Sequence, residues 1–161
     1  MPAFVGARHD HGQCVRTALG EAVRLCAERG ARLTAIRRRV LELVWRSHEP
    51  VGAYDLLALL ARDGRRAQPP VVYRALDFLR DQGLVHRLAS INAYVGCALP
   101  SRPHVGQFLI CRDCGNAAEI DDKRVTNALA SSADRLGFAI GDVAIEASGV
   151  CARCAPGHGR P

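Results

Sequence analysis

The chain has 161 residues, of which 22 are Lys or Arg and 16 are Asp or Glu, giving a formal net charge of +6. This length allows one large domain or two small ones, and 48% hydrophobic with 24% charged residues is typical of a soluble globular protein. No apolar run approaches the roughly 18 residues that span a bilayer, and the N-terminus carries no secretory signature, so a cytosolic protein is expected.

The net positive charge lies in the first half of the chain. Residues 1–88 contain 15 basic and 9 acidic residues, whereas residues 89–161 contain 7 of each. A basic half joined to a neutral half is typical of a polyanion-binding module fused to a second domain. The alternative is a merely Arg-rich composition, because all but one of the basic residues are Arg.

Four helices and a hairpin are predicted in the basic half. Apolar residues recur at helical spacing over residues 13–29, 34–47, 53–62 and 69–82. The last of these helices opens with two prolines, which the first helical turn tolerates, and ends at Gly83. Residues 84–97 then alternate around a turn at 90–92, as a β-hairpin does. Short helices followed by a hairpin predict a winged helix-turn-helix.

The helix over residues 69–82 is the candidate DNA reader. Val72, Leu76 and Leu79 repeat along one face, while Tyr73 and Arg74 project from another. In helix-turn-helix proteins the N-terminal residues of the second helix reach base edges in the major groove. An Arg there can bond guanine in bidentate fashion.

The remainder of the chain predicts a linker and a small second domain. Residues 98–106 contain two prolines and a glycine and show no periodicity. Beyond them we expect strands at 107–112, 117–121, 138–140 and 143–147, with a helix at 123–136. Such a unit is too small to bury much core alone, so pairing with a second copy is predicted.

These elements predict an α+β protein with two domains joined by a hinge. We assign a winged-helix DNA-binding domain to 1–97, a hinge to 98–106, and a dimerisation and structural zinc domain to 107–155. Residues 156–161 are assigned to a tail.

Two C-x-x-C pairs carry the clearest chemical signal. Each pair offers two thiols from one tight turn, and four thiolates satisfy tetrahedral zinc without an open position; they are Cys111, Cys114, Cys151 and Cys154. The alternative is a thiol redox enzyme, which requires an active-site helix after C-x-x-C that neither pair has. Cys14 and Cys26 lie within the first helix, away from other ligand types, and are expected to be packing or incidental residues.

A second candidate site has irregular spacing. It consists of His86, Cys97, His104 and Glu119. Nitrogen, sulfur and oxygen donors in one set suit zinc and disfavour calcium or magnesium. The spacing alone leaves open that any of the four is a surface or packing residue.

The order of these motifs resembles the ferric uptake regulator family over about residues 13–155. The resemblance rests on LTAIRRRVLELV, AYDLLALL, PPVVYRALDFLRDQGLVHRL, CRDCG and CARC, and SRPHVGQFLICRDCG is similar to the family's zinc-specific branch, the zinc uptake regulators. It implies a non-enzymatic homodimer that represses zinc-uptake genes on a palindromic DNA operator, with one or two dimers bound. It also implies two zinc ions per subunit, a structural one on the four cysteines and a regulatory one at the hinge on His86, Cys97, His104 and Glu119. DNA-contacting positions carried over from the family are Tyr54, Tyr73, Arg74 and Arg37.

The chain also departs from the family pattern. Val71 stands where a Thr or Ser is frequent before V-Y-R, which removes a helix cap and a phosphate contact. The His-rich run of iron and peroxide sensors is absent, which favours zinc. Two alternatives stay open, namely a regulator of the same fold that senses another metal or peroxide, and a zinc-ribbon interaction module without DNA activity.

Overall fold

The computed structural model describes residues 10–47, 49–64 and 67–155. The predicted tail, residues 156–161, lies outside them. The chain divides between Arg102 and Pro103 into two compact units, here called the N-terminal and the C-terminal unit. This division falls inside the segment 98–106 that we predicted as a hinge.

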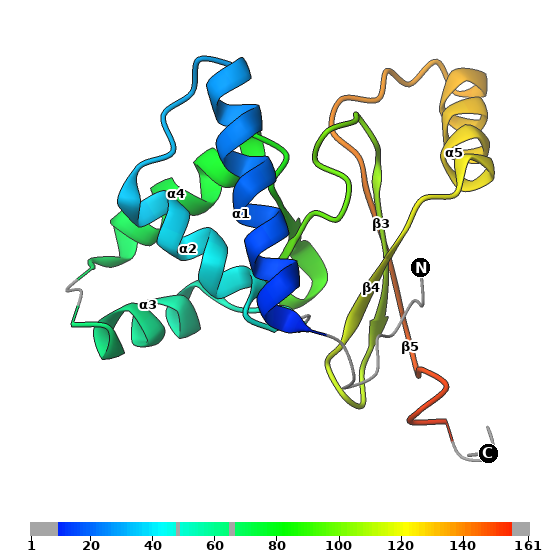
Figure 1. The fold of residues 1–161 in the computed structure, drawn as a ribbon. Coiled ribbons are helices and arrows are strands. Elements are labelled where there is room, and N and C mark those ends of the chain that lie inside the picture. The colour runs from blue at the N-terminus through cyan, green and yellow to red at the C-terminus, as the bar shows by residue number, and fades with distance from the viewer. Residues whose placement is uncertain (1–9, 48, 65–66, 156–161) are drawn as a thin grey trace. The chain divides into compact units, whose positions relative to one another are not determined.

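The N-terminal unit is a helical bundle followed by a hairpin (Figure 1). Its elements in chain order are α1 (His11–Glu28), α2 (Ala35–Trp45), α3 (Ala53–Arg62), α4 (Pro69–Asp81), β1 (Val85–Leu88), a 3-10 turn (Ala89–Ile91) and β2 (Ala93–Gly96). The hairpin strands are antiparallel, with Val85 opposite Gly96 and Leu88 opposite Ala93. Helices α2 to α4 with this hairpin form the predicted winged helix-turn-helix, and the α+β class is confirmed.

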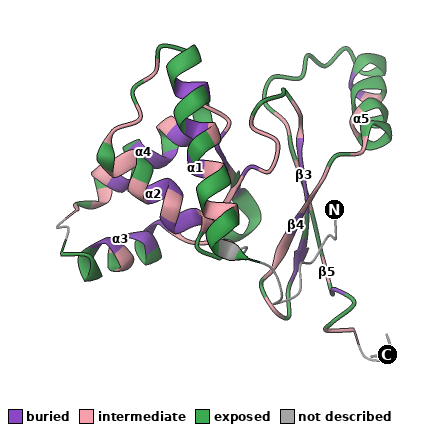
Figure 2. Ribbon diagram, viewed as in Figure 1, coloured by how far each residue is buried: buried purple, intermediate pink, exposed green. Residues whose placement is uncertain are grey.

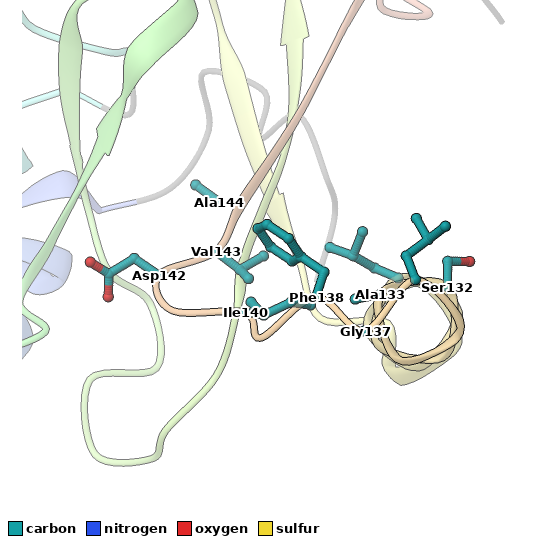
Figure 3. Close-up of a pocket in the computed structure, with 10 residues that line it drawn as sticks. Ser132, Ala133, Gly137, Phe138, Ile140, Asp142, Val143 and Ala144 are labelled. Carbon is teal, nitrogen blue, oxygen red and sulfur yellow. The ribbon is translucent and has the colours of Figure 1, made fainter.

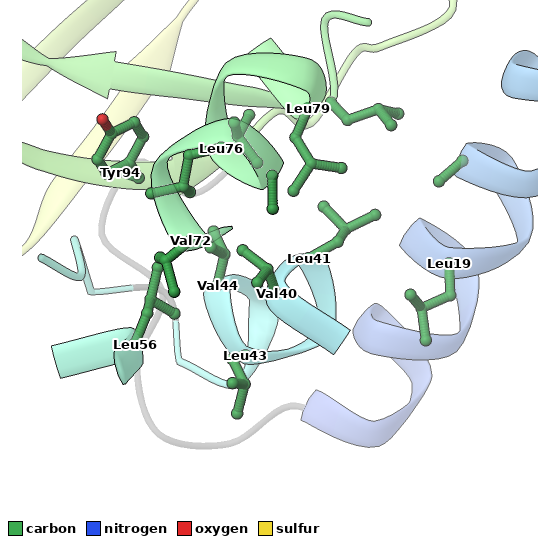
Figure 4. Packing of buried hydrophobic residues seen from close by; sticks show 14 of the residues in the cluster. Leu19, Val40, Leu41, Leu43, Val44, Leu56, Val72, Leu76, Leu79 and Tyr94 are labelled. Carbon is green, nitrogen blue, oxygen red and sulfur yellow. The ribbon is translucent and has the colours of Figure 1, made fainter. Parts of the chain in front are cut away.

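Aliphatic side chains from all four helices fill one core in this unit (Figure 4). Leu41, Leu56, Leu76 and Leu79 are among the largest side chains that are fully buried. Each such side chain contributes roughly 1.5–3 kcal/mol when it leaves water. The inward face of α4 therefore fixes this helix against α2 and α3, and its opposite face is exposed to solvent.

Left-handed backbone positions end α4 and turn the hairpin. Gly83 has φ of 66°, and the N–H of Leu84 then donates to the carbonyl of Leu79 at 2.8 Å. Such a closure satisfies helix-end carbonyls and is favoured by glycine, which lacks a Cβ. Asn92 takes φ of 48° between the hairpin strands, a conformation that Asn tolerates better than most residues. Three residues, Gln82 to Leu84, therefore separate the end of α4 from the first strand of the hairpin.

The C-terminal unit is a three-stranded sheet with one helix. Its elements are β3 (Gly106–Cys111), β4 (Ala117–Ile120), α5 (Lys123–Arg135) and β5 (Ala144–Gly149). Strand β3 is central, antiparallel to β4 and parallel to β5. A parallel neighbour requires a crossover connection, and α5 lies in that crossover.

Gln107 joins the helix of this unit to its sheet. The side chain is 1% exposed, and its amide nitrogen donates to the carbonyl of Asp122 at 3.0 Å and to Thr126 Oγ1 at 2.9 Å. Both acceptors lie at the start of α5, so one buried amide orients the helix on the central strand. Figure 2 shows that most of α5 is nevertheless exposed.

The strand predicted at residues 138–140 is wrong. After α5 the chain turns at Gly137, and residues 138–140 form no strand. The alternation of Phe138, Ala139 and Ile140 is too short to specify a ladder, because a strand exists only where a neighbour accepts its hydrogen bonds. In this unit β5 occupies the free edge of β3, so the preceding residues serve as connection.

Apolar side chains of that connection remain exposed beside α5. Phe138 is 64% exposed and Leu136 83%. With Leu129 and Ile140 they border an open hollow of about 510 Å³ (Figure 3). An exposed apolar surface of this kind marks an interaction site more often than a chance arrangement.

Trp45 packs directly on the backbone of the wing. A Cβ added to Gly96 would lie 2.3 Å from Cε2 and 2.4 Å from Nε1 of the indole. No real Cβ approaches an aromatic atom so closely, so glycine is required for the end of α2 to lie against β2.

Replacing Gly96 with Ala is expected to destabilise the N-terminal unit by about 1–3 kcal/mol, because the indole and the wing must separate. The measurement is the urea or thermal unfolding midpoint of the purified protein. Gly20→Ala is the matched control, since nothing lies within 4 Å of a Cβ added at that exposed site in α1. It should stabilise by roughly 0.5–1 kcal/mol through helix propensity. Equal midpoints for the two variants would contradict the proposed contact.

Candidate metal centres and nucleic-acid interface

The pairing of β3 with β5 brings the two C-x-x-C pairs together. Cys111 is the last residue of β3 and lies opposite Gly149, the last residue of β5. Because the strands are parallel, their carboxyl ends meet at one edge of the sheet, and the turns that follow them carry the other cysteines. Cys114 lies in the turn after β3, and Cys151 and Cys154 lie beyond β5.

The four sulfur atoms form a compact cluster. All lie within 4.8 Å of one another, and the Cys114 and Cys151 sulfurs are 3.9 Å apart. Tetrahedral zinc with Zn–S bonds of about 2.3 Å requires sulfur separations of roughly 3.8 Å. Cys111 and Cys151 are buried, and the set leaves no position for a substrate. The donor set and its spacing therefore fit a closed, structural zinc site.

Hydrogen bonds shift the pKa values of two thiols in this cluster in opposite directions. The N–H of Cys151 donates to Cys111 Sγ at 3.3 Å, and this and other backbone donors lower the pKa of the Cys111 thiol to about 6. The hydrogen bond to the Cys151 sulfur raises the pKa of Cys154 to about 12. Binding of a metal ion releases the protons of its thiol ligands, so affinity for zinc falls in acid. The side-chain amide of Asn116 donates a hydrogen bond to Cys114 Sγ at 3.6 Å. Sequence reasoning missed this contact, although Asn116 is only two residues from the cysteine.

The surroundings of the cysteines do not support a thiol redox enzyme. The residues after Cys114 lead into β4, and those after Cys151 form a turn. Within the residues that the structure describes, up to Ala155, neither pair begins a helix whose N-terminus would lower the pKa of a redox-active thiol.

The structure places two members of the second predicted site on the wing. His86 lies on β1 and Cys97 directly follows β2, where its N–H donates to the carbonyl of Leu84 at 3.0 Å. Leu84 and His86 project to the same side of the hairpin, so His86 and Cys97 are diagonal neighbours within reach of a common ion. The Cys97 side chain is 2% exposed.

The other two members lie together in the C-terminal unit. His104 Nε2 is 2.8 Å from Glu119 Oε1, and both side chains are largely buried. Glu119 lies on β4 opposite Phe108 of β3, while His104 lies in the segment that leads into β3. Each unit thus presents two donors of the set, and assignment of all four to one ion belongs to the proposal below.

The predicted DNA-contacting residues differ in exposure. On α4, Tyr73 and Arg74 are exposed while Val72 points into the core (Figure 4). Tyr54 is 71% exposed in the first turn of α3. Helices α3 and α4 therefore present aromatic and basic side chains to solvent.

Arg37 differs from the other three. Its guanidinium lies over the ring of Phe78 at 3.7 Å from the centroid, and Nη1 donates to the carbonyl of Arg32 at 2.6 Å. Both contacts are within the N-terminal unit, and sequence reasoning missed them. Direct contact of Arg37 with DNA stays a prediction.

Val71 is the third residue of α4 and not its N-cap, so the expectation that Val71 removes a helix cap is wrong. The N-cap residue is Gln68, which makes no side-chain capping hydrogen bond, and Pro69 and Pro70 open the helix. The two prolines lack backbone N–H groups, so the first turn of α4 has fewer donors that a cap would have to satisfy.

Comparison with known proteins identifies the family. The model of the Ferric uptake regulator family matches residues 28–148. The chain belongs to this family. The zinc uptake regulation protein of Escherichia coli (strain K12) is 43% identical over 137 residues, which are 84% of this chain and 80% of that protein.

Two solved structures show the same fold at similar identity. One, described as a zinc uptake regulator complexed with zinc and DNA, is 42% identical, with a TM-score of 0.83 over 87% of this chain and 94% of its own. The other, the crystal structure of holo XcZur, is 43% identical, with a TM-score of 0.79 over 86% of this chain and 96% of its own. Among the described residues, no helix combines the length and apolarity that crossing a membrane requires.

Cys154→Ser is expected to abolish zinc binding at the cysteine cluster and to unfold the C-terminal unit. Structural zinc contributes about 10–16 kcal/mol in zinc-finger peptides at neutral pH, more than this small core can replace. Metal analysis after gel filtration and circular dichroism would measure the loss. Cys14→Ser, outside the cluster on α1, is the control and should retain the wild-type zinc content. Unchanged zinc content in Cys154→Ser would refute the assignment.

Proposed function

We propose that this protein is a zinc-responsive repressor, which binds operator DNA as a homodimer when loaded with zinc and represses zinc-uptake genes. Family membership and likeness to a regulator solved with zinc and DNA support this proposal. The observation that carries it is the distribution of donors, with an imidazole and a thiol on the wing and an imidazole and a carboxylate in the C-terminal unit. The protein is then a cytoplasmic regulator and not an enzyme.

We assign two zinc ions to each subunit. Cys111, Cys114, Cys151 and Cys154 hold the structural ion, and the regulatory ion is held by His86, Cys97, His104 and Glu119. Mixed nitrogen, sulfur and oxygen donors suit zinc. The proposed domains are 1–97 for DNA binding, 98–106 as hinge, 107–155 for dimerisation and 156–161 as tail.

Regulation follows from the origin of the regulatory ligands. Because each unit supplies two of them, affinity for zinc depends on the arrangement of the two units. By linkage, bound zinc favours the arrangement that holds the ligands together, and the same arrangement is proposed to bind DNA. In a dimer, the two reading helices must meet half-sites at multiples of about 34–36 Å.

The exposed apolar surface of the C-terminal unit supports dimerisation. Four apolar side chains on this surface are exposed, and the unit is too small to be stable on its own core alone; they are Leu129, Leu136, Phe138 and Ile140. A second copy would cover this surface. The operator is then palindromic, with one or two dimers bound.

DNA contact is assigned to exposed residues on α3 and α4. Tyr73 and Arg74 on α4 are proposed to reach base edges, and Tyr54 on α3 the neighbouring backbone. Arg37 was also predicted as a contact, and its packing on Phe78 is considered separately below.

A regulator of another metal or of peroxide is the second candidate. The missing His-rich run counts against it, and operator binding with zinc, iron and manganese in parallel distinguishes the two. Operator binding promoted by iron or manganese but not by zinc would favour the alternative.

His104→Ala is expected to lower the zinc content from two ions per subunit to one and to abolish zinc-dependent operator binding. The cysteine cluster does not include His104, so the fold and the dimer should persist. A zinc titration by gel shift, with metal analysis and gel filtration, measures all three properties. His158→Ala, in the predicted tail, is the control. Operator binding that remains zinc-dependent in His104→Ala would contradict the regulatory assignment.

Arg74→Ala is expected to weaken operator binding by about 1–3 kcal/mol, because one bidentate contact to a guanine is lost. Affinity is compared on the operator and on a random duplex of the same length. An equal loss on both duplexes would mean that Arg74 contacts only phosphate.

A further inference from the structure

The three consecutive arginines of α2 have different surroundings. Arg38 is exposed. Arg39 forms ion pairs with Glu42 and Asp63, each at 2.7 Å, and so connects α2 to Asp63, the C-cap residue of α3. Arg37 stacks on Phe78 of α4 and donates to the carbonyl of Arg32. A run of positive charge that suggests DNA contact thus contains two residues engaged inside the unit.

Phe78 lies on α4 close to Arg74, a residue proposed to contact bases. It follows Arg74 by four residues, so the two side chains lie on the same face of α4, one turn apart. Phe78 is half-buried, whereas Arg74 is exposed. A contact that holds the ring of Phe78 therefore restricts rotation and sliding of α4, and with them the position of the Arg74 side chain.

The other contacts of α4 with the core are less directional. Val72, Leu76 and Leu79 pack through aliphatic groups, and apolar burial has no directional preference. The N-terminus of α4 has no side-chain cap that would orient it. A guanidinium over an aromatic face has a defined geometry, and the 2.6 Å hydrogen bond to Arg32 fixes the position of that guanidinium.

We propose that Arg37 is a positioning residue, which clamps Phe78 and thereby sets the rotation of α4 that presents Tyr73 and Arg74 to bases. This inference rests on the proposed DNA-binding function. It replaces the predicted direct contact of Arg37 with DNA by an effect through Phe78. Loss of the clamp should therefore reduce discrimination between operator and random DNA, while the number of phosphate contacts stays the same.

The test compares Arg37→Ala, Arg37→Lys and Phe78→Leu with the double variant Arg37→Ala/Phe78→Leu. Arg38→Ala and Arg38→Lys are charge-matched controls from the same helix. Zinc-loaded proteins are titrated with operator and random duplexes at several salt concentrations, at a temperature where every variant is folded. Thermal unfolding without DNA is measured in parallel.

We expect Arg37→Ala and Phe78→Leu each to weaken operator binding about three- to tenfold, with a smaller effect on random DNA. Arg37→Lys should restore little, because an ammonium keeps the charge but lacks the planar group that stacks. The double variant should resemble the more affected single variant, both in operator affinity and in unfolding midpoint. The slope of log affinity against log salt should match the wild type.

Three results would overturn the proposal. The first is full rescue by Arg37→Lys, normal binding by Phe78→Leu and a salt slope lowered by about 0.9 in Arg37→Ala, which together identify a phosphate contact. The second is unchanged operator affinity in every folded variant, which would leave Arg37 a merely stabilising role. The third is additivity of the two substitutions in unfolding. Wild-type protein that binds no operator with zinc would instead reject the proposed function, and the unfolding cycle would still decide whether the clamp exists.

Discussion

The pairing of β3 with β5 is the contact on which the C-terminal unit depends. It places two strands in parallel, so that both carboxyl ends, and the C-x-x-C turns beyond them, lie at one edge of the sheet. Cysteines 40 residues apart in sequence thereby come within bonding range of a single ion. The rest of the unit has little buried apolar area. A zinc ion bound at this edge would add to the strand pairing the stability that the core lacks.

In the N-terminal unit the corresponding constraint is the two-sided character of α4. One face must be apolar enough to fix the helix in the core, and the other must stay polar and accessible. Apolar packing alone determines that the helix is buried, but it determines less well how the helix is rotated. Directional contacts such as Arg37 on Phe78 are suited to that second task. Recognition of bases within hydrogen-bond tolerances requires this rotation to be well defined.

The wing joins the two roles of the N-terminal unit. Its strands carry His86 and precede Cys97, and its last residue, Gly96, lies under the indole of Trp45 at the end of α2. The same hairpin therefore offers metal donors on one side and packs against a core helix through its backbone. Any ion held by these donors would act on a rigid element, because the glycine leaves no space between the wing and α2.

Much of the fold and of the cysteine site was determined by local sequence. Helix periodicity, the prolines before α4, the glycine after it and two C-x-x-C turns are local signals with direct physical causes, and the matching elements were predicted close to their observed bounds. Tertiary structure alone decided three other features. Residues 138–140 are not a strand, because β5 takes the free edge of β3. Arg37 packs on Phe78 because α2 and α4 pack together across the core, and His104 meets Glu119 because β4 pairs with β3. These contacts depend on which distant segments become neighbours, and neither composition nor short-range periodicity specifies that.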